Sequence, residues 1–276
     1  MRVNLHCHSN ISDGTLSPRD LIKRMSEDKL ELIALTDHDK VDGILEAQIE
    51  ANKHGIRFVN GIEISCKAQD LNLDFLNSID SGLHILGLGF DLEIIQDIYQ
   101  KRMIEKKNRI QKLVNTLKEN GYDIGFHDNL VKKTSVAESL VHNGYASDVQ
   151  DAFNRIINKY YDKHKDNMNV TEAIQIIHDA NGKAIWAHPF DILNFVVKER
   201  IDENKVDLIC QRLKVLGIDG IEVYYEIFTL QQQDFLKEMQ YKYGFISSVG
   251  TDYHAKREGE STYIEVNESL VMRWLK

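Results

Sequence analysis

Short apolar runs alternate with longer segments of helical spacing along most of the chain. The short runs have the length and composition of buried strands, and the longer segments repeat their apolar residues as an amphipathic helix does. We expect strands at residues 3–5, 32–35, 57–64, 83–88, 184–187, 218–224 and 245–249. Alternation of strands and helices favours a mostly parallel sheet, either open or closed into a barrel.

Helices are predicted between these strands, and several carry recognisable end signals. The first begins after Ser17, with Pro18 in its first turn, because proline is favoured at the start of a helix. A second helix, at about 41–54, is closed by Gly55, and Thr171 is expected to cap a third. Two further helices are expected at about 203–216 and 230–243.

The pattern changes after residue 91. Between residues 92 and 170 the chain is rich in Lys, Asn, Asp and Glu, and most of its apolar residues fit helical spacing. The alternation of strand and helix resumes after residue 170. We therefore predict an α/β barrel formed by residues 1–91 and 171–276, interrupted by a helical insertion at residues 92–170.

Composition narrows the class of protein. Hydrophobic residues make up 42% of the 276 positions, and no apolar run approaches the length of a membrane span. The formal net charge of -9 argues against a generally basic surface for nucleic acid, and we find no DNA-binding module. No signal-peptide pattern follows Met1, so we expect a cytoplasmic protein without a membrane partner.

The three cysteines, Cys7, Cys66 and Cys210, have neither disulfide-framework nor zinc-finger spacing. We expect all three to be buried free thiols. Cys7 lies between two histidines, but on a strand its side chain points to the face opposite theirs.

Ligand-type side chains gather where the expected strands end. They are His6, His8, His38, His84, His188 and His254, together with Asp13, Glu63 and Asp252. His84 lies near the start of its strand and fits this pattern least well. Because the carboxyl ends of parallel strands converge on one face of a barrel, residues far apart in the sequence are expected to meet there.

Two local spacings support a shared metal site. His6 and His8 are two residues apart, so a strand presents both imidazoles on one face, and Asp252 and His254 repeat that spacing. Imidazole suits zinc, iron or manganese, and carboxylates ligate or bridge the same ions. A lone histidine after a strand is usually an ordinary polar residue, but nine ligand-type side chains favour a metal site. The other histidines, His54, His127, His142, His164 and His178, are expected to be surface or packing residues.

A charge count indicates the class of substrate. With neutral imidazoles and ionised carboxylates, three divalent ions would leave the cluster with about three positive charges in excess. That excess favours a phosphate anion and a hydroxide nucleophile. The sequence contains no Ser-His-Asp set, cysteine nucleophile or glycine-rich phosphate loop. The predicted cofactors are therefore two or three divalent metal ions, of Mn, Fe or Zn.

Six motifs, in order along the chain, resemble those of the PHP (polymerase and histidinol phosphatase) phosphoesterase family. They are Leu5-His6-Cys7-His8-Ser9 with Ser12-Asp13-Gly14, Thr36-Asp37-His38-Asp39, Gly61-Ile62-Glu63-Ile64, His84-Ile85-Leu86-Gly87, Ala187-His188-Pro189 and Gly250-Thr251-Asp252-Tyr253-His254. The resemblance covers nearly the whole chain. It implies a distorted (β/α)7 barrel with a trinuclear metal site.

The resemblance also implies which residues hold each ion. By position, they are His6, His8, Glu63 and Asp252 for the first ion, Glu63, His84 and His188 for the second, and Asp13, His38 and His254 for the third. Asp37 would orient one of the ligands. We expect Glu63, Asp13, His188 and Asp37 to act most directly in catalysis.

Within the family, the insertion resembles that of stand-alone bacterial enzymes that dephosphorylate nucleoside 3′,5′-bisphosphates or trim 5′-phosphorylated RNA. Where that subgroup has an Arg-Pro-His-like stretch, this chain has Lys132-Lys133-Thr134-Ser135-Val136, which leaves the organic part of the substrate open. Arg102 and Arg109, seven residues apart, share a helical face. With Lys133 they are the predicted substrate-binding residues.

The leading hypothesis is a metal-dependent phosphatase that acts on a nucleoside 3′,5′-bisphosphate or a 5′-phosphorylated RNA end. The first alternative is a phosphatase for a small non-nucleotide metabolite, such as histidinol phosphate. An alternative of another class is a non-catalytic metal-binding PHP module, against which the intact ligand set argues.

Overall fold

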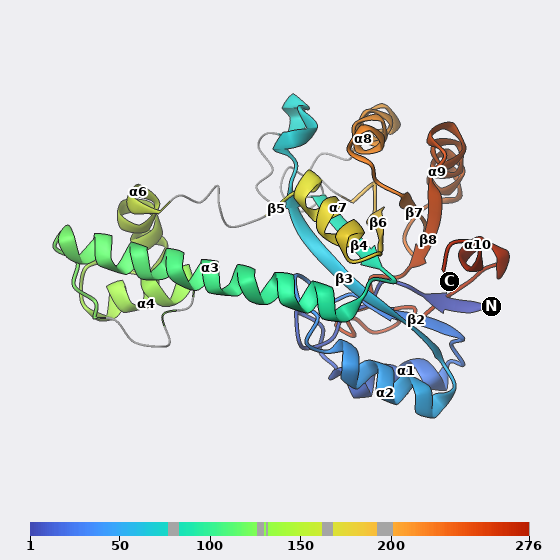
Figure 1. The fold of residues 1–276 in the computed structure, drawn as a ribbon, viewed down its shortest axis with the longest axis horizontal. Coiled ribbons are helices and arrows are strands. Elements are labelled where there is room, and N and C mark those ends of the chain that lie inside the picture. Colours follow the sequence, from blue (N-terminus) through green and yellow to red (C-terminus); the bar gives the residue numbers. More distant parts are fainter. Residues whose placement is uncertain (77–82, 126–129, 131, 162–167, 192–200, 276) are drawn as a thin grey trace. The chain divides into compact units, whose positions relative to one another are not determined.

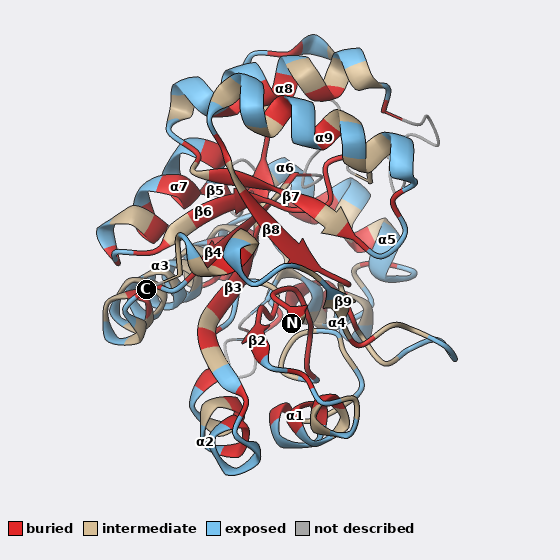
Figure 2. Ribbon diagram, turned by 90° about the vertical axis from the view of Figure 1, so that its right-hand side faces the viewer, coloured by how far each residue is buried: buried red, intermediate tan, exposed pale blue. Residues whose placement is uncertain are grey.

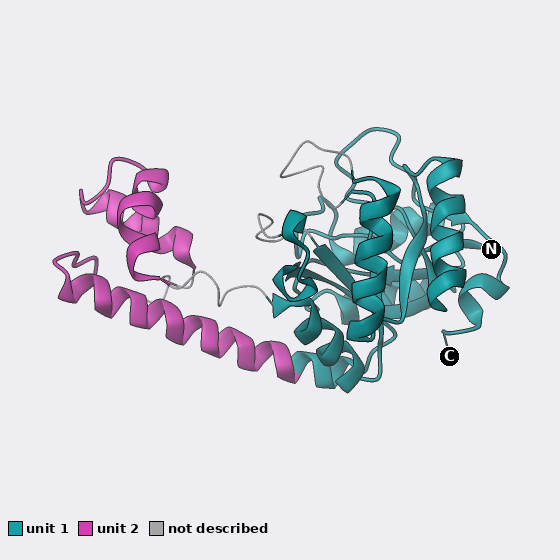
Figure 3. Cartoon of the chain, turned by 90° about the horizontal axis from the view of Figure 1, so that it is seen from above, with its two compact units in different colours: residues 1–96, 167–276 teal, residues 97–166 magenta. Residues whose placement is uncertain are grey.

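The computed structural model describes residues 1–76, 83–125, 130, 132–161, 168–191 and 201–275. The chain forms two compact units, the larger from residues 1–96 and 167–276 and the smaller from residues 97–166 (Figure 3). Each unit has a hydrophobic core of its own. The assignment of residues 1–91 and 171–276 to a barrel domain, with 92–170 as its insertion, stays a prediction.

The described strands of the larger unit form one sheet (Figure 1). They are β1 (Arg2–Asn4), β2 (Leu32–Leu35), β3 (Arg57–Lys67), β4 (Leu83–Leu88), β5 (Met168–Asn169), β6 (Lys183–Trp186), β7 (Gly220–Tyr225), β8 (Ile246–Gly250) and β9 (Ile264–Glu265). Their order is β8-β7-β6-β4-β3-β2-β1-β9, with β5 paired to β3. Two backbone hydrogen bonds, Leu5 N to Val249 O (2.9 Å) and His8 N to Tyr253 O (2.8 Å), join the segment that follows β1 to β8 and its continuation, and nearly close the barrel.

Strand β4 is the main departure from a parallel barrel. It runs antiparallel to both neighbours, β3 and β6, whereas β1, β2 and β3 are parallel to one another, as are β6, β7 and β8. Because β4 is reversed, its first residues lie at the barrel end where β3 and β6 finish. His84, in register with Ser65 of β3, therefore faces the same end as the other predicted ligands.

Helices with buried inner faces surround the sheet (Figure 2). They are α1 (Pro18–Glu27), α2 (Ile44–His54), α7 (Val170–Asp179), α8 (Glu203–Leu216), α9 (Leu230–Tyr243) and α10 (Ser269–Met272), with short 3-10 turns at Gln69–Leu71 and Asp74–Leu76. The predicted start of α1 is confirmed, since the Ser17 side chain accepts a hydrogen bond from Asp20 N. Gly55 ends α2 in the left-handed conformation, with φ of 68°.

The predicted cap of α7 was wrong by two residues. Asn169 is the cap, and its side-chain oxygen accepts a hydrogen bond from Glu172 N at 2.7 Å. Thr171 instead donates its backbone N–H and its hydroxyl to the Asp70 carboxylate, at 2.8 and 2.7 Å. A contact with a residue distant in sequence decides the role of Thr171.

A bend at Leu5 sets which side chains beyond β1 face the barrel interior. Val3 and Leu5 belong to the apolar cluster that the strands enclose. Cys7 packs instead in the cluster under α1 and α2, and its thiol donates to Ala34 O at 3.1 Å. His6 and His8 are thereby turned inward, opposite Cys7, as predicted. All three cysteines are buried and free.

The smaller unit is helical in its described residues. It contains most of α3 (Leu92–Glu119), α4 (Lys133–His142), α5 (Val149–Asp151), a π-helical turn at Ala152–Ile157 and α6 (Asn158–Tyr160). Its core includes Leu113, Leu117, Leu140 and Ile156. Among the helices of the described segments, none is both long and apolar enough to cross a membrane.

Candidate metal centre

The structure brings all nine predicted ligand-type residues into one cluster at one end of the barrel. Every one of them contacts at least one other member through a nitrogen–oxygen pair. Seven of them follow the ends of β1, β2, β6 and β8. Glu63 lies within β3, and His84 lies near the start of β4. Residues from both ends of the chain therefore meet in the larger unit.

Glu63 lies at the centre of this cluster. Its side chain is fully buried, and its two oxygens face five histidines. The Oε1 atom lies 2.8 Å from His84 Nδ1 and 3.1 Å from His188 Nε2. The Oε2 atom lies 3.0–3.3 Å from nitrogens of His6, His8 and His38. One carboxylate is thus positioned to be shared between neighbouring cations.

Three overlapping groups have ligand atoms within 4.8 Å of one another. They are His6, His8, Glu63 and Asp252; His38, Glu63 and His84; and His8, Asp13, His38 and His254. The first group is the set that the resemblance implies for the first ion. In the third group His8 joins the three expected residues. His188, expected beside His84, lies with its Nε2 3.2 Å from His84 Nδ1.

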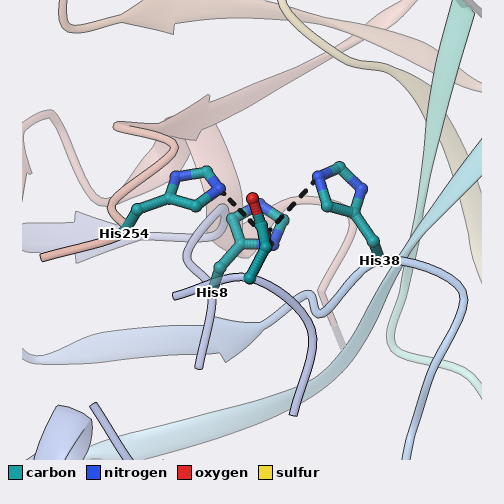
Figure 4. A group of neighbouring side chains, drawn as sticks. His8, His38 and His254 are labelled. Carbon is teal, nitrogen blue, oxygen red and sulfur yellow. Dashed lines mark ion pairs between the residues drawn. The ribbon is translucent and has the colours of Figure 1, made fainter. Parts of the chain in front are cut away.

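The third group is the most open of the three. In Figure 4, His8 lies between His254 and His38, with ring centroids 4.2 and 4.6 Å from those neighbours. The Asp13 Oδ1 atom lies 3.1 Å from His254 Nε2, and Asp13 Oδ2 is 2.8 Å from Lys256 Nζ. The Asp13 side chain is 46% exposed, whereas the His8 side chain is fully buried. Solvent therefore reaches the cluster from the Asp13 side.

Two of these residues adopt a backbone conformation that non-glycine residues rarely take. His188 has φ of 31° and Asp252 has φ of 52°. Both follow strands, and the left-handed turn at each position brings the side chain back into the cluster. Such conformations cost about 1–3 kcal/mol each and persist only where surrounding contacts enforce them. The contacts of the fold thus hold a strained backbone at His188 and Asp252, and this places their side chains in the cluster.

Burial and charge oppose each other at these side chains. Burial alone would lower the pKa of His6, but the carboxylates of Glu63, Glu222 and Asp252 raise it well above its ordinary value. Burial would raise the pKa of Glu63, but the neighbouring imidazoles hold it well below its usual range. Burial lowers the pKa of His38 to about 4. The buried carboxylates are therefore ionised, and a cation is electrostatically favoured among them.

Several buried polar atoms in the cluster point at one another without forming hydrogen bonds. Among the described residues, they include His6 Nε2, both ring nitrogens of His8, His38 Nδ1 and Glu63 Oε2. Buried polar groups left unsatisfied are costly and rare. Imidazole and carboxylate ligands of this kind suit zinc, iron or manganese, so the donor set fits divalent metal ions.

The remaining predicted site residues lie in two different settings. The Asp37 carboxylate accepts hydrogen bonds from Ser9 and Ser12, and so fixes the loop that carries Asp13. Arg102 and Arg109 lie on α3 and Lys133 on α4, in the smaller unit. Lys133 lies over the Tyr161 ring, 5.2 Å from its centroid.

Of the histidines expected to be ordinary, two have simple partners. His54 contacts Glu50 at 3.3 Å and His178 contacts Asp219 at 2.7 Å. His142 is exposed at the end of α4. His127 and His164 lie outside the described residues.

Sequence reasoning missed three buried residues that support the cluster. Asn4 accepts from His6 N (3.1 Å) and donates to the Thr251 hydroxyl (2.8 Å). Glu222 and Tyr225, both on β7, contact ligand-type residues directly. Of the three, Glu222 gave a signal in the sequence. It is an acidic residue within an apolar strand, and an ionisable group there needs a buried partner.

Comparison with known proteins agrees with the fold and the cluster. The family model that matches describes the PHP domain, over residues 4–271. A 5′-3′ exoribonuclease of Haemophilus influenzae is 31% identical over 266 residues, which cover 92% of this chain and 90% of that protein. A 3′,5′-nucleoside bisphosphate phosphatase of Chromobacterium violaceum is 27% identical over 275 residues, covering 93% and 88%.

A solved structure shows the same fold. It is that of a candidate metal-dependent phosphoesterase from Bifidobacterium adolescentis, with a TM-score of 0.61 at 23% identity, covering 98% of this chain and 94% of that one. The α/β barrel and its ligand cluster thus define a metal-dependent phosphoesterase. The chain belongs to the PHP family. The prediction of an enzyme, rather than a non-catalytic module, is confirmed.

Proposed function

We propose that this phosphoesterase holds two or three divalent ions of Mn, Fe or Zn and hydrolyses phosphate esters of nucleoside 3′,5′-bisphosphates or of 5′-phosphorylated RNA ends. The observation that carries the proposal is the convergence of imidazoles and carboxylates on the shared, fully buried Glu63. The two relatives named above, a nucleoside bisphosphate phosphatase and an exoribonuclease, support this class of substrate.

The ions would be held by the residues of the three groups. His6, His8, Glu63 and Asp252 would hold one, Glu63, His84 and His188 a second, and Asp13, His38 and His254 a third. When bound, such ions make hydroxide available near neutral pH and neutralise the charge of a phosphate. His38 Nδ1, 3.0 Å from Glu63 Oε2, is close enough to serve the second ion as well.

The chain's own residues would guide the substrate to the exposed side of the cluster. His6, His8 and Glu63 are fully buried, so a phosphate approaches past Asp13. The ammonium group of Lys256, which contacts Asp13 Oδ2 at 2.8 Å, places a positive charge at that edge. An ammonium group at this edge can pair with a phosphate oxygen.

Selectivity for a bisphosphate needs groups beyond the metal cluster, because metal ions bind any phosphate that reaches them. We assign this role to the predicted residues Arg102, Arg109 and Lys133. Guanidinium groups bind phosphate through paired hydrogen bonds, and lysine acts as a point charge. The helical spacing of the two arginines would present both to one ligand.

Release of phosphate, and from RNA also of mononucleotides, from a substrate panel tests this proposal. The panel contains a nucleoside 3′,5′-bisphosphate, the matching 5′-monophosphate, histidinol phosphate, and one RNA oligomer with either a 5′-phosphate or a 5′-hydroxyl. The bisphosphate or the 5′-phosphorylated RNA should give a kcat/KM at least about tenfold above the other esters, equivalent to one extra ionic contact. The highest kcat/KM on histidinol phosphate would instead support the small-metabolite alternative.

A further inference from the structure

Strand β7 contributes none of the nine ligand-type residues, although it lies between β6, which leads to His188, and β8, which leads to Asp252. Two of its side chains nevertheless reach the cluster. Glu222 contacts His6 and His188, and Tyr225 contacts Asp252. A single strand thus contacts ligand-type residues from three other segments of the barrel.

Glu222 holds two of these residues at once. Its carboxylate accepts from His6 Nδ1, at 3.2 Å to Oε1 and 3.4 Å to Oε2. Its Oε2 also accepts from His188 N at 2.8 Å. With Nδ1 as the donor, the His6 Nε2 lone pair faces Glu63 and Asp252. The second bond anchors the backbone of His188, where φ is 31°.

The fold is shaped to admit this buried carboxylate. Glu222 is fully buried, and burying a charge is costly unless it is paired and hydrogen-bonded. On the neighbouring strand, a Cβ at Gly250 would lie 2.5 Å from Glu222 Oε1 and 2.3 Å from His6 Cβ. Only glycine leaves enough space there for Glu222 to reach His6.

Tyr225 acts on a third ligand of the same group. Its hydroxyl donates to Asp252 Oδ2 at 3.2 Å, while Asp252 Oδ1 lies 2.9 Å from His8 Nε2. The bond leaves Oδ1 turned toward the histidines. The Tyr225 side chain is largely buried, and its ring packs against Phe228 at a centroid distance of 4.9 Å, so it has little freedom to move.

We propose that Glu222 and Tyr225 are positioning residues that prepare the group of His6, His8, Glu63 and Asp252 for its metal ion. Glu222 selects the His6 tautomer whose Nε2 is free to bind metal, and Tyr225 selects the Asp252 oxygen that faces the ion. The inference rests on the metal centre of the proposed function, and it assigns to β7 the orientation of ligands carried by other strands. Outer partners of this kind typically change metal affinity about 10–100-fold when removed.

Glu222→Gln tests the role of the carboxylate at nearly constant volume. Two donors, His6 Nδ1–H and His188 N–H, face this side chain, and an amide offers one acceptor oxygen and one NH₂ donor. If the NH₂ faces His6, it favours the tautomer with a proton on Nε2, which excludes a metal ion. If the NH₂ faces His188, it meets the backbone N–H of His188, which is also a donor. The hydrogen bond that holds the strained turn at His188 is then lost.

The experiment compares zinc binding by the wild type, Glu222→Gln, Tyr225→Phe and Ser248→Ala, each as the full chain. Ser248 is the matched control, because it is paired with Glu222 on β8, is fully buried, and its hydroxyl makes no hydrogen bond among the described residues. Chelator competition gives the affinity of each ion and elemental analysis the number bound. Proton–nitrogen NMR of the zinc-loaded protein reports the hydrogen-bonded His6 Nδ1–H.

The proposal expects Glu222→Gln to weaken binding of one zinc ion about 10–100-fold and to lose the Nδ1–H signal. Tyr225→Phe should weaken the same ion about fivefold, as for one lost hydrogen bond, and Ser248→Ala should bind as the wild type does. The melting temperature of metal-free Glu222→Gln should be unchanged or higher, because a buried charge is removed.

Three results would overturn the proposal while the proposed function stands. In the first, Glu222→Gln binds zinc as tightly as the wild type does. In the second, Ser248→Ala loses as much zinc affinity as Glu222→Gln. In the third, Glu222→Gln does not fold and Tyr225→Phe binds zinc with the wild-type affinity. A wild-type protein that binds no zinc, manganese or iron would overturn the metal centre itself, and this inference with it.

Discussion

Replacement of Glu63 by glutamine should disable the centre almost completely while preserving the size of the side chain. Its Oε1 faces two histidine nitrogens and its Oε2 three, all within 3.3 Å. An amide therefore turns its NH₂ group toward at least two imidazole nitrogens in either orientation. The substitution also removes the negative charge that neighbouring ions of the proposed centre would share. Loss of one such electrostatic element costs about 3 kcal/mol, or roughly 100-fold in turnover.

The assay is phosphate release at saturating metal and substrate, with metal content measured on the same samples. We expect Glu63→Gln to lower kcat by at least about 100-fold and to bind fewer ions. His142→Ala is the control, because His142 is exposed on α4 and should leave kcat within about threefold of the wild type. Similar turnover in the two variants would refute the central position assigned to Glu63.

Gly250→Ala should lower the melting temperature by roughly 3–10 °C in a thermal unfolding scan, because its Cβ would lie 2.3 Å from His6 Cβ; an unchanged melting temperature would contradict the close packing there. After metal removal, Mn²⁺, Fe²⁺ or Zn²⁺ should restore phosphate release better than Mg²⁺, which prefers oxygen ligands; restoration by Mg²⁺ alone would argue against imidazole ligation. At least one alanine variant of the insertion should lose about tenfold in kcat/KM for a bisphosphate yet keep its activity on a generic phosphate ester; equal losses on both esters would return selectivity to the barrel loops. The variants to compare are Arg102→Ala, Arg109→Ala and Lys133→Ala.

The sequence indicated which polar side chains would gather at one end of the barrel, because strand ends are visible in it; their roles as metal ligands stay a prediction. Most of the expected strands recur within one or two residues, and the ligand-type residues that follow β1, β2, β6 and β8 were easily recognised. His84 was the exception, because nothing in an apolar run of six residues shows in which direction the strand runs. Only the pairing of β4 with β3 and β6 explains its place in the cluster.

Residues whose roles depend on distant partners were not predictable in the same way. Glu222 reads as one polar residue in an apolar strand, and its partner His6 is 216 positions away. Threonine is a residue type that often caps helices, but Thr171 donates its hydrogen bonds to the Asp70 carboxylate. Tertiary contacts override local preference in both cases.

Metal analysis of the purified protein, combined with phosphate release before and after chelation, tests the central claim most directly. We predict about two or three ions of Mn, Fe or Zn per chain, loss of activity when a chelator removes them, and recovery when they are returned. Full phosphate release from exhaustively chelated protein that contains no metal would contradict the account.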